Sequence, residues 1–137
     1  MFLFRPMELK DLQPILASDN LKALLTVPPM GEKWGMVLEE EGLLKGGATG
    51  YCETDADGQK RAVVQAILFE PEMDLLPIRD GMLRSIVNKA DLMEAYELYC
   101  PQELMGNLYH AIGFRPDEKT GLMHLNTREF FSKGHHH

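Results

Sequence analysis

The sequence predicts one α/β domain: a mixed, mostly antiparallel sheet with one parallel pair of strands, flanked by helices. Two observations lead to this fold class. Apolar segments of strand and helix periodicity follow one another as strand, two helices, three strands, helix, strand, helix and two strands. In addition, a helix joins the strand predicted at 61–69 to the strand predicted at 95–100. Such a connection is right-handed and places the two strands parallel to each other.

The first half of the chain is predicted to contain the antiparallel strands. Residues 2–5 form a short strand, and residues 8–17 and 21–25 form two short helices. Residues 34–39 and 43–53 form two strands, and Asp55 and Gly58 mark a hairpin turn into the strand at 61–69. That strand is rich in Val, Ile and Leu, which is typical of a central strand buried on both faces.

The second half begins with the clearest helix, whose apolar residues fall on one stripe: Leu75, Leu76, Met82, Leu83, Ile86, Val87 and Ala90. A strand at 95–100 follows. Residues 101–113 are predicted to form another helix, with Gly113 as its C-terminal stop. Two further strands are expected from Phe114 and at 122–125, and the assignment of 126–131 stays open.

Composition limits the function classes. The chain has 137 residues, of which 45% are hydrophobic and 26% are charged. This size and composition suit one globular domain, which we assign to residues 1–133. Residues 134–137 resemble the remnant of a purification tag. The net charge of −7 argues against a nucleic-acid partner. No segment approaches the roughly 18 apolar residues of a membrane span, so we expect no membrane partner and a cytoplasmic location. Cys52 and Cys100 lack metal-ligand spacing, so we expect reduced thiols and no metal site.

Three short motifs, in this order, resemble the GNAT (Gcn5-related N-acetyltransferase) superfamily. They are Arg5-Pro6 followed by Asp11-Leu12, then Glu70-Pro71-Glu72, and finally Leu108-Tyr109-His110-Ala111-Ile112-Gly113-Phe114. The resemblance implies a GNAT-like fold and an acyl-CoA-dependent N-acetyltransferase whose small-molecule or peptide amine attacks the thioester directly. It also implies acetyl-CoA as cofactor, lying between the two parallel strands, with its pyrophosphate at the N-terminus of the next helix.

The pyrophosphate loop departs from the family pattern. The family's Gln/Arg-x-x-Gly-x-Gly/Ala positions fall on Asp74, Pro77 and Arg79. Pro77 offers no N–H. A carboxylate at Asp74 would repel a phosphate by about 1 kcal/mol at 4 Å in water and about 4 kcal/mol at an effective dielectric constant of 20. Arg79 or Arg84 would offset this by direct contact.

A structural role explains the same loop residues. Asp74 is a suitable helix N-cap, and Pro77 is tolerated in a first turn. The alternative function is therefore a non-catalytic GNAT-fold module for binding or self-association, for example a homodimer, that has lost ordinary CoA binding.

The resemblance also implies site residues. Tyr109 would protonate the departing thiolate, although a packing role is equally compatible with its position. Glu70, at the end of the central strand, is the candidate general base, with a solvated carboxylate as the alternative. Gln102 stands where the family often has Asn. The residues expected near the cofactor are Leu68, Phe69, Pro77, Ile78, Arg79, Arg84 and Gln102.

Overall fold

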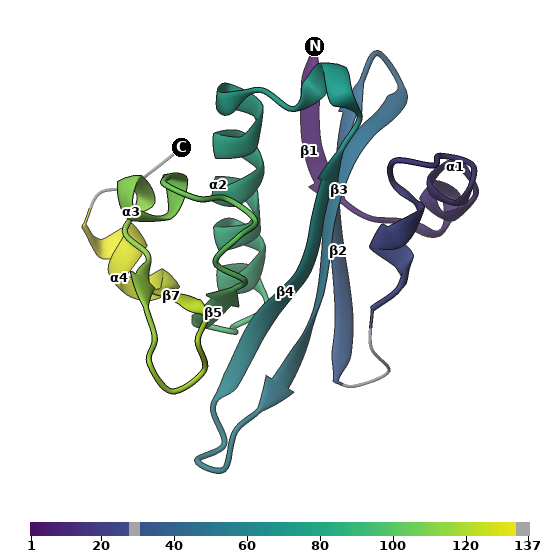
Figure 1. The fold of residues 1–137 in the computed structure, drawn as a ribbon. Coiled ribbons are helices and arrows are strands. Elements are labelled where there is room, and N and C mark those ends of the chain that lie inside the picture. The colour runs from purple at the N-terminus through teal and green to yellow at the C-terminus, as the bar shows by residue number, and fades with distance from the viewer. Residues whose placement is uncertain (28–30, 134–137) are drawn as a thin grey trace.

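A computed structural model describes residues 1–27 and 31–133, so the predicted tag remnant at 134–137 lies outside it. The described strands form one mixed sheet in the order β1-β2-β3-β4-β5-β7-β6 (Figure 1). Only β4 and β5 are parallel among these strands, which confirms the predicted fold class. The strands are β1 (Phe2–Pro6), β2 (Glu32–Glu40), β3 (Leu43–Thr54), β4 (Lys60–Phe69), β5 (Glu97–Cys100), β6 (Arg115–Pro116) and β7 (Met123–Asn126).

Helices lie on both faces of the sheet. One face packs against α1 (Leu12–Leu16) and the 3-10 turn η2 (Lys22–Leu25), while the other packs against α2 (Leu76–Leu92), α3 (Leu108–Ile112) and α4 (Thr127–Ser132). In Figure 1, α1 stands beside β2 and β3 and away from β5 and β7. Two further 3-10 turns are η1 (Leu9–Asp11) and η3 (Pro71–Met73). No described helix has the length and apolar character that crossing a membrane requires.

The two faces have separate cores because side chains alternate along each strand. The larger core holds Trp34, Met36, Leu38 and the inner stripe of α2, and the smaller one holds Ile15, Leu21, Leu24 and Val37. Gly50 of β3 lies directly under the Trp34 ring, where an added Cβ would come within 2.6 Å of a ring carbon. A glycine is therefore required at this position.

The helix predicted at 101–113 is wrong in its first half. Only residues 108–112 are helical, and residues 102–107 form successive turns. Gly106 adopts φ +53°, in the left-handed region, and this conformation interrupts a right-handed helix. Gly113, with φ +122°, ends α3 as predicted. The open segment 126–131 falls largely in α4, whose first turn is capped by the Asn126 side chain, which accepts a hydrogen bond from the Glu129 amide at 2.9 Å.

The start of α2 also differs from the prediction. The apolar stripe begins at Ile78, whereas Leu75 and Leu76 are 54% and 66% exposed. Asp74 is not the N-cap: Leu75 occupies that position, and the Asp74 carboxylate accepts a hydrogen bond from Arg79 at 2.9 Å instead. Pro77 does lie in the first turn, as the structural interpretation of this loop requires.

A buried ion pair fixes the first loop to the edge of the sheet. Arg5 donates two hydrogen bonds of 2.8 Å to the carboxylate of Asp11, which is buried, and a further one of 2.9 Å to Glu39. The Asp11 carboxylate also accepts the Glu8 amide at 2.7 Å. The Arg5 guanidinium lowers the pKa of Asp11 below its ordinary value of 3.8.

Asp11→Asn is expected to lower the free energy of unfolding at neutral pH by about 2–3 kcal/mol, because it leaves Arg5 without its buried partner. A carboxylate whose folded-state pKa is depressed stabilises the fold above its unfolded-state pKa, and this contribution is lost as the pH falls through the folded-state value. Urea unfolding should therefore show wild type and variant converging below about pH 4. Asp19→Asn, at an exposed carboxylate paired with Lys22, is the control and should change stability by less than about 0.5 kcal/mol.

Candidate active site

The parallel strands β4 and β5 separate soon after they meet. They pair over three residues only, from Arg61↔Glu97 to Val63↔Tyr99, while β4 continues to Phe69. The chain turns away from the sheet after Cys100 (Figure 1). Among the described strands, none pairs with residues 64–69 of β4 on the β5 side. Backbone groups on this side are therefore available to a ligand, because polar backbone groups inside a protein need partners.

A β-bulge lies beside the point of separation. Gly50 of β3 pairs with Val64 and Thr49 pairs with Ala66, so Gln65 is the extra residue on β4. The bulge changes the alternation of β4: Val64 and Ile67 both belong to the larger core, while Ala66 packs against the smaller one. A bulge leaves backbone groups outside the ladder and re-aims its neighbours.

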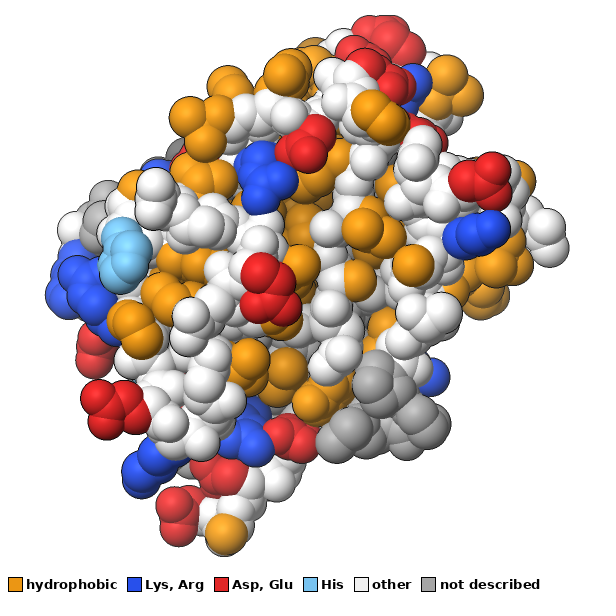
Figure 2. All heavy atoms as spheres, in the orientation of Figure 1, with side chains coloured by type: hydrophobic (Ala, Val, Ile, Leu, Met, Phe, Trp, Pro, Cys, Tyr) orange, Lys and Arg blue, Asp and Glu red, His pale blue; other side chains and the backbone are white. Residues whose placement is uncertain are grey.

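Hydrophobic side chains surround the opening that β4 and β5 leave between them beyond Val63. Figure 2 shows a shallow hollow on this face, with hydrophobic side chains along its floor. Ile67 of β4 and Met105 of the segment after β5 are buried in the larger core, and Phe69 and Leu104 are partly buried against it. The setting suits an extended ligand that has an apolar arm and a few polar groups.

Tyr109 lies at the C-terminal end of β5. Its side chain is 1% exposed, its ring contacts Phe114 at a centroid distance of 5.1 Å, and its hydroxyl donates to the Pro101 carbonyl at 2.6 Å. Burial raises the pKa of Tyr109 well above the ordinary value of 10. Burial likewise raises the pKa of the neighbouring Cys100 thiol. Both groups therefore remain protonated at neutral pH, so Cys100 is no nucleophile. The Tyr109 phenol has a proton to donate, but its raised pKa makes it a weaker acid than an exposed tyrosine.

The first turn of α2 is connected to the segment after β5 by Arg79. Its guanidinium donates to the Asp74 carboxylate at 2.9 Å and to the Leu104 carbonyl. The first amides of a helix have no intrahelical acceptor; in α2 these are the amides of Leu76 and Ile78, because Pro77 has none. The turn thus offers two N–H groups and one arginine, with a carboxylate beside them.

The remaining expected cofactor residues lie in different places. Arg84 pairs with Asp80 at 2.9 Å on the side of α2 that faces β1, away from Arg79. Gln102 donates to the Gly121 carbonyl at 2.9 Å and so ties the segment after β5 to the turn before β7. Phe69 packs on the α2 face of the sheet, with its ring against Gly46, and Leu68 packs on the α1 face.

The structure does not bring Glu70 to Tyr109. The Glu70 carboxylate accepts hydrogen bonds from the Ser18 hydroxyl at 2.9 Å and the Asn20 amide at 2.7 Å, on the face covered by α1. Tyr109 belongs to the core on the opposite face. In this position Glu70 holds the loop between α1 and η2 against the end of β4.

Three residues that were not predicted as site residues lie on the face away from α2, along the short stretch where β4 and β5 pair. Glu97 and Tyr99 alternate along β5 with the buried Leu98 and Cys100. His124 of β7 lies opposite Tyr99 in the ladder, and their rings are 4.8 Å apart. A signal was present in the sequence, because alternation on a short strand places Glu97 and Tyr99 together on one face. The pairing with His124 could not be deduced without the strand order.

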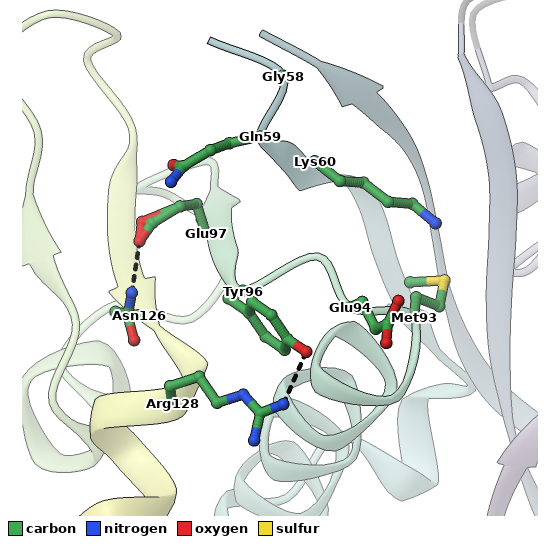
Figure 3. A pocket seen from close by; sticks show the side chains of 9 residues that line it. All are labelled: Gly58, Gln59, Lys60, Met93, Glu94, Tyr96, Glu97, Asn126 and Arg128. Carbon is green, nitrogen blue, oxygen red and sulfur yellow. Dashed lines mark hydrogen bonds between the residues drawn. The ribbon is translucent and has the colours of Figure 1, made fainter.

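A separate polar cleft of about 670 Å³ lies at the other end of β4 and β5 (Figure 3). Here the Arg128 guanidinium lies 4.3 Å from the centre of the Tyr96 ring and donates to its hydroxyl at 2.7 Å, and Asn126 donates to Glu97 at 2.7 Å. Lys60 pairs with Glu32 at 3.1 Å. Since the two cations of the cleft, Arg128 and Lys60, already have partners, the cleft is a weaker candidate than the opening between β4 and β5.

Sequence comparison identifies no relative: no family model and no curated protein matches the chain. Solved structures do match. An acetyltransferase from Trypanosoma brucei is 15% identical with a TM-score of 0.68, covering 86% of this chain and 95% of its own. The spermidine/spermine N-acetyltransferase of Vibrio cholerae is 14% identical with a TM-score of 0.67, covering 98% and 99%. A "predicted acetyltransferase" from Clostridium acetobutylicum, solved with acetyl-CoA, is 15% identical with a TM-score of 0.64, covering 87% and 93%.

These similarities extend over nearly the whole domain, and at such low identity they establish the fold. The mixed sheet with one parallel pair and the flanking helices of this chain match those structures. The described part of the chain therefore has the GNAT acetyltransferase fold.

Proposed function

We propose that this chain binds an acyl-CoA, such as acetyl-CoA, between β4 and β5 and transfers the acyl group to an amine. The observation that carries the proposal is the unpaired side of β4 beyond Val63, next to the Gln65 bulge. The pantetheine arm of CoA is extended and contains two amides, so it can complete the hydrogen bonds that β5 leaves open. Backbone N–H groups near Ala66 would then hold the thioester carbonyl as negative charge develops on it.

Tyr109 is the proton donor in this proposal. Its hydroxyl lies at the end of β5, where a thioester sulfur bound between the strands would approach. The amine nitrogen forms a bond to the carbonyl carbon, the C–S bond breaks, and the sulfur keeps the electron pair and takes the Tyr109 proton. The phenol must exchange its Pro101 acceptor for sulfur, and because its side chain is 1% exposed, neighbouring side chains must shift to let the sulfur reach the hydroxyl.

The pyrophosphate would be held by Arg79 and by the free amides of Leu76 and Ile78. An arginine that already spans from α2 to Leu104 can move to a phosphate without a change of backbone. The Asp74 carboxylate repels the pyrophosphate at this site, and we therefore propose a lower affinity for CoA than a glycine-rich loop would provide.

A non-catalytic binding or self-association module is the second candidate, and one observation favours it. The Arg79 bridge to Asp74 and Leu104 occupies the first turn of α2 without any ligand. If Arg79 keeps these two hydrogen bonds when CoA is present, the pyrophosphate has no binding site at the first turn of α2.

Isothermal titration with acetyl-CoA separates the two candidates. The transferase predicts binding with a dissociation constant between about 1 μM and 1 mM. An absence of heat at roughly millimolar acetyl-CoA would exclude an acyl-CoA enzyme and leave the module.

A further inference from the structure

The half of the sheet that α1 leaves uncovered carries a cluster of titratable side chains beside the proposed acyl site. The cluster consists of Glu97, Tyr99 and His124, with Arg61 of β4 at its margin, 5.6 Å from the centre of the Tyr99 ring. None of these residues packs into either hydrophobic core. Glu97 and His124 side chains are 24% and 32% exposed, so solvent or a ligand can reach them.

Glu97 fixes the imidazole of His124. One oxygen of the carboxylate lies 3.1 Å from His124 Nε2, and the other accepts a hydrogen bond of 2.7 Å from Asn126. An ionised carboxylate only accepts hydrogen bonds, so His124 Nε2 carries the hydrogen and Nδ1 holds the lone pair. A carboxylate that orients a histidine in this way makes the second nitrogen an effective proton acceptor.

The cluster and Tyr109 flank the same strand end from opposite faces. Tyr99 is the last residue of β5 that pairs with β4. Tyr109 donates to Pro101, two residues further along, from the α2 face. A thioester held where the strands separate would therefore have a proton donor on one face and a histidine on the other. Direct acyl transfer uses both groups, because the leaving thiolate gains a proton and the arriving amine loses its protons.

We propose that His124, positioned by Glu97, accepts the proton of the incoming amine. This inference rests on the transferase function proposed above. Nδ1 of His124 takes one proton from the ammonium form of the acceptor, and the freed lone pair attacks the carbonyl carbon. The C–S bond breaks with its electron pair on sulfur, which gains a proton from Tyr109. The second amine proton and the proton on His124 leave to solvent, and Tyr109 regains one from it.

Several charged or titratable groups face His124. They are Glu97 and Tyr99 on β5, Arg115 opposite it on β6, and Asp117 at the end of β6. Arg61 lies one strand beyond β5, on β4, and its partner Glu53 lies on β3. Variants at His124 must be compared over a range of pH for this reason.

The test compares the two histidines of residues 1–133 in the intact chain. Acetyl-CoA is supplied with a panel of primary amines (a polyamine, an amino sugar, an amino acid and a tripeptide) and, separately, with hydroxylamine. His124→Asn is expected to lower kcat for the amines about 100-fold and to leave the dissociation constant of acetyl-CoA unchanged. Hydroxylamine, which is largely unprotonated at neutral pH, should restore the rate. His110→Asn, on the exposed side of α3 and lining the same surface pocket as Glu97 and His124, removes a neighbouring imidazole and should behave like wild type.

Glu97→Gln tests the positioning role without removing the base. It is expected to lower kcat about tenfold and to shift the acidic limb of the pH profile, because the amide no longer fixes the tautomer. Acetyl-CoA binding and amine transfer by wild type, with full activity in His124→Asn, would overturn this inference alone. If wild type transfers to neither amines nor hydroxylamine, the proposed function and the inference both fall.

Discussion

Tyr109→Phe is expected to lower kcat for acyl transfer about 100-fold, because it removes the proton that the departing thiolate takes. The dissociation constant of acetyl-CoA should stay the same, since the ring and its contact with Phe114 remain. Loss of the hydrogen bond to Pro101 should cost about 1 kcal/mol of unfolding free energy. Steady-state release of free CoA thiol, measured together with calorimetry, separates these effects.

Tyr96→Phe is the matched control for this experiment. Its hydroxyl bonds to Arg128 in the polar cleft away from the opening, so kcat should not change. Because burial raises the pKa of Tyr109, loss of activity at high pH through this group should occur only above the ordinary tyrosine value of 10. Equal kcat in Tyr109→Phe and wild type would leave Tyr109 as a packing residue.

Asp74→Asn is expected to tighten acetyl-CoA binding about tenfold. The change removes the carboxylate next to the proposed pyrophosphate seat, and repulsion of about 1 kcal/mol or more disappears with it. It also releases Arg79 from its 2.9 Å pair, so the guanidinium can turn to the phosphate. Arg79→Gln should have the opposite effect and weaken binding about tenfold.

Glu72→Gln controls for net charge. This carboxylate is two residues away and pairs with Lys45 at 2.9 Å on the exposed surface. Glu72→Gln makes the same change of net charge as Asp74→Asn without altering α2. Screening by salt should keep its effect on acetyl-CoA affinity small. If Asp74→Asn and Glu72→Gln change the affinity equally, the effect is one of overall charge, and Asp74 does not lie at the pyrophosphate.

The sequence predicted the sheet and the long helix well because these elements depend on local periodicity. The apolar run of β4, the turn at Asp55 and the buried stripe of α2 all carry their own signal. In the segment after β5, the local signal was misleading. Leu104 and Leu108 have helical spacing, yet Gly106 adopts a left-handed conformation and the segment forms turns. Turn chemistry overrode periodicity there.

Site residues were harder to predict because they depend on long-range pairing. The motif around Tyr109 could be located in the sequence, and the structure places its hydroxyl at the end of β5. Glu70 ends its strand as expected, but alternation after the Gln65 bulge directs its carboxylate to Ser18 on the other face. His124 meets Glu97 only because β7 inserts between β5 and β6, an order that no local pattern contains.

The most direct test of the central claim is an NMR titration of the ¹⁵N-labelled chain with acetyl-CoA. Binding between β4 and β5 predicts large shift changes for the amides of Gln65 and Ala66 and for those of residues 102–109, with little change at Gly58 and Glu94 in the polar cleft. Changes confined to the polar cleft, or none at roughly millimolar acetyl-CoA, would contradict an acyl-CoA site at the diverging strands.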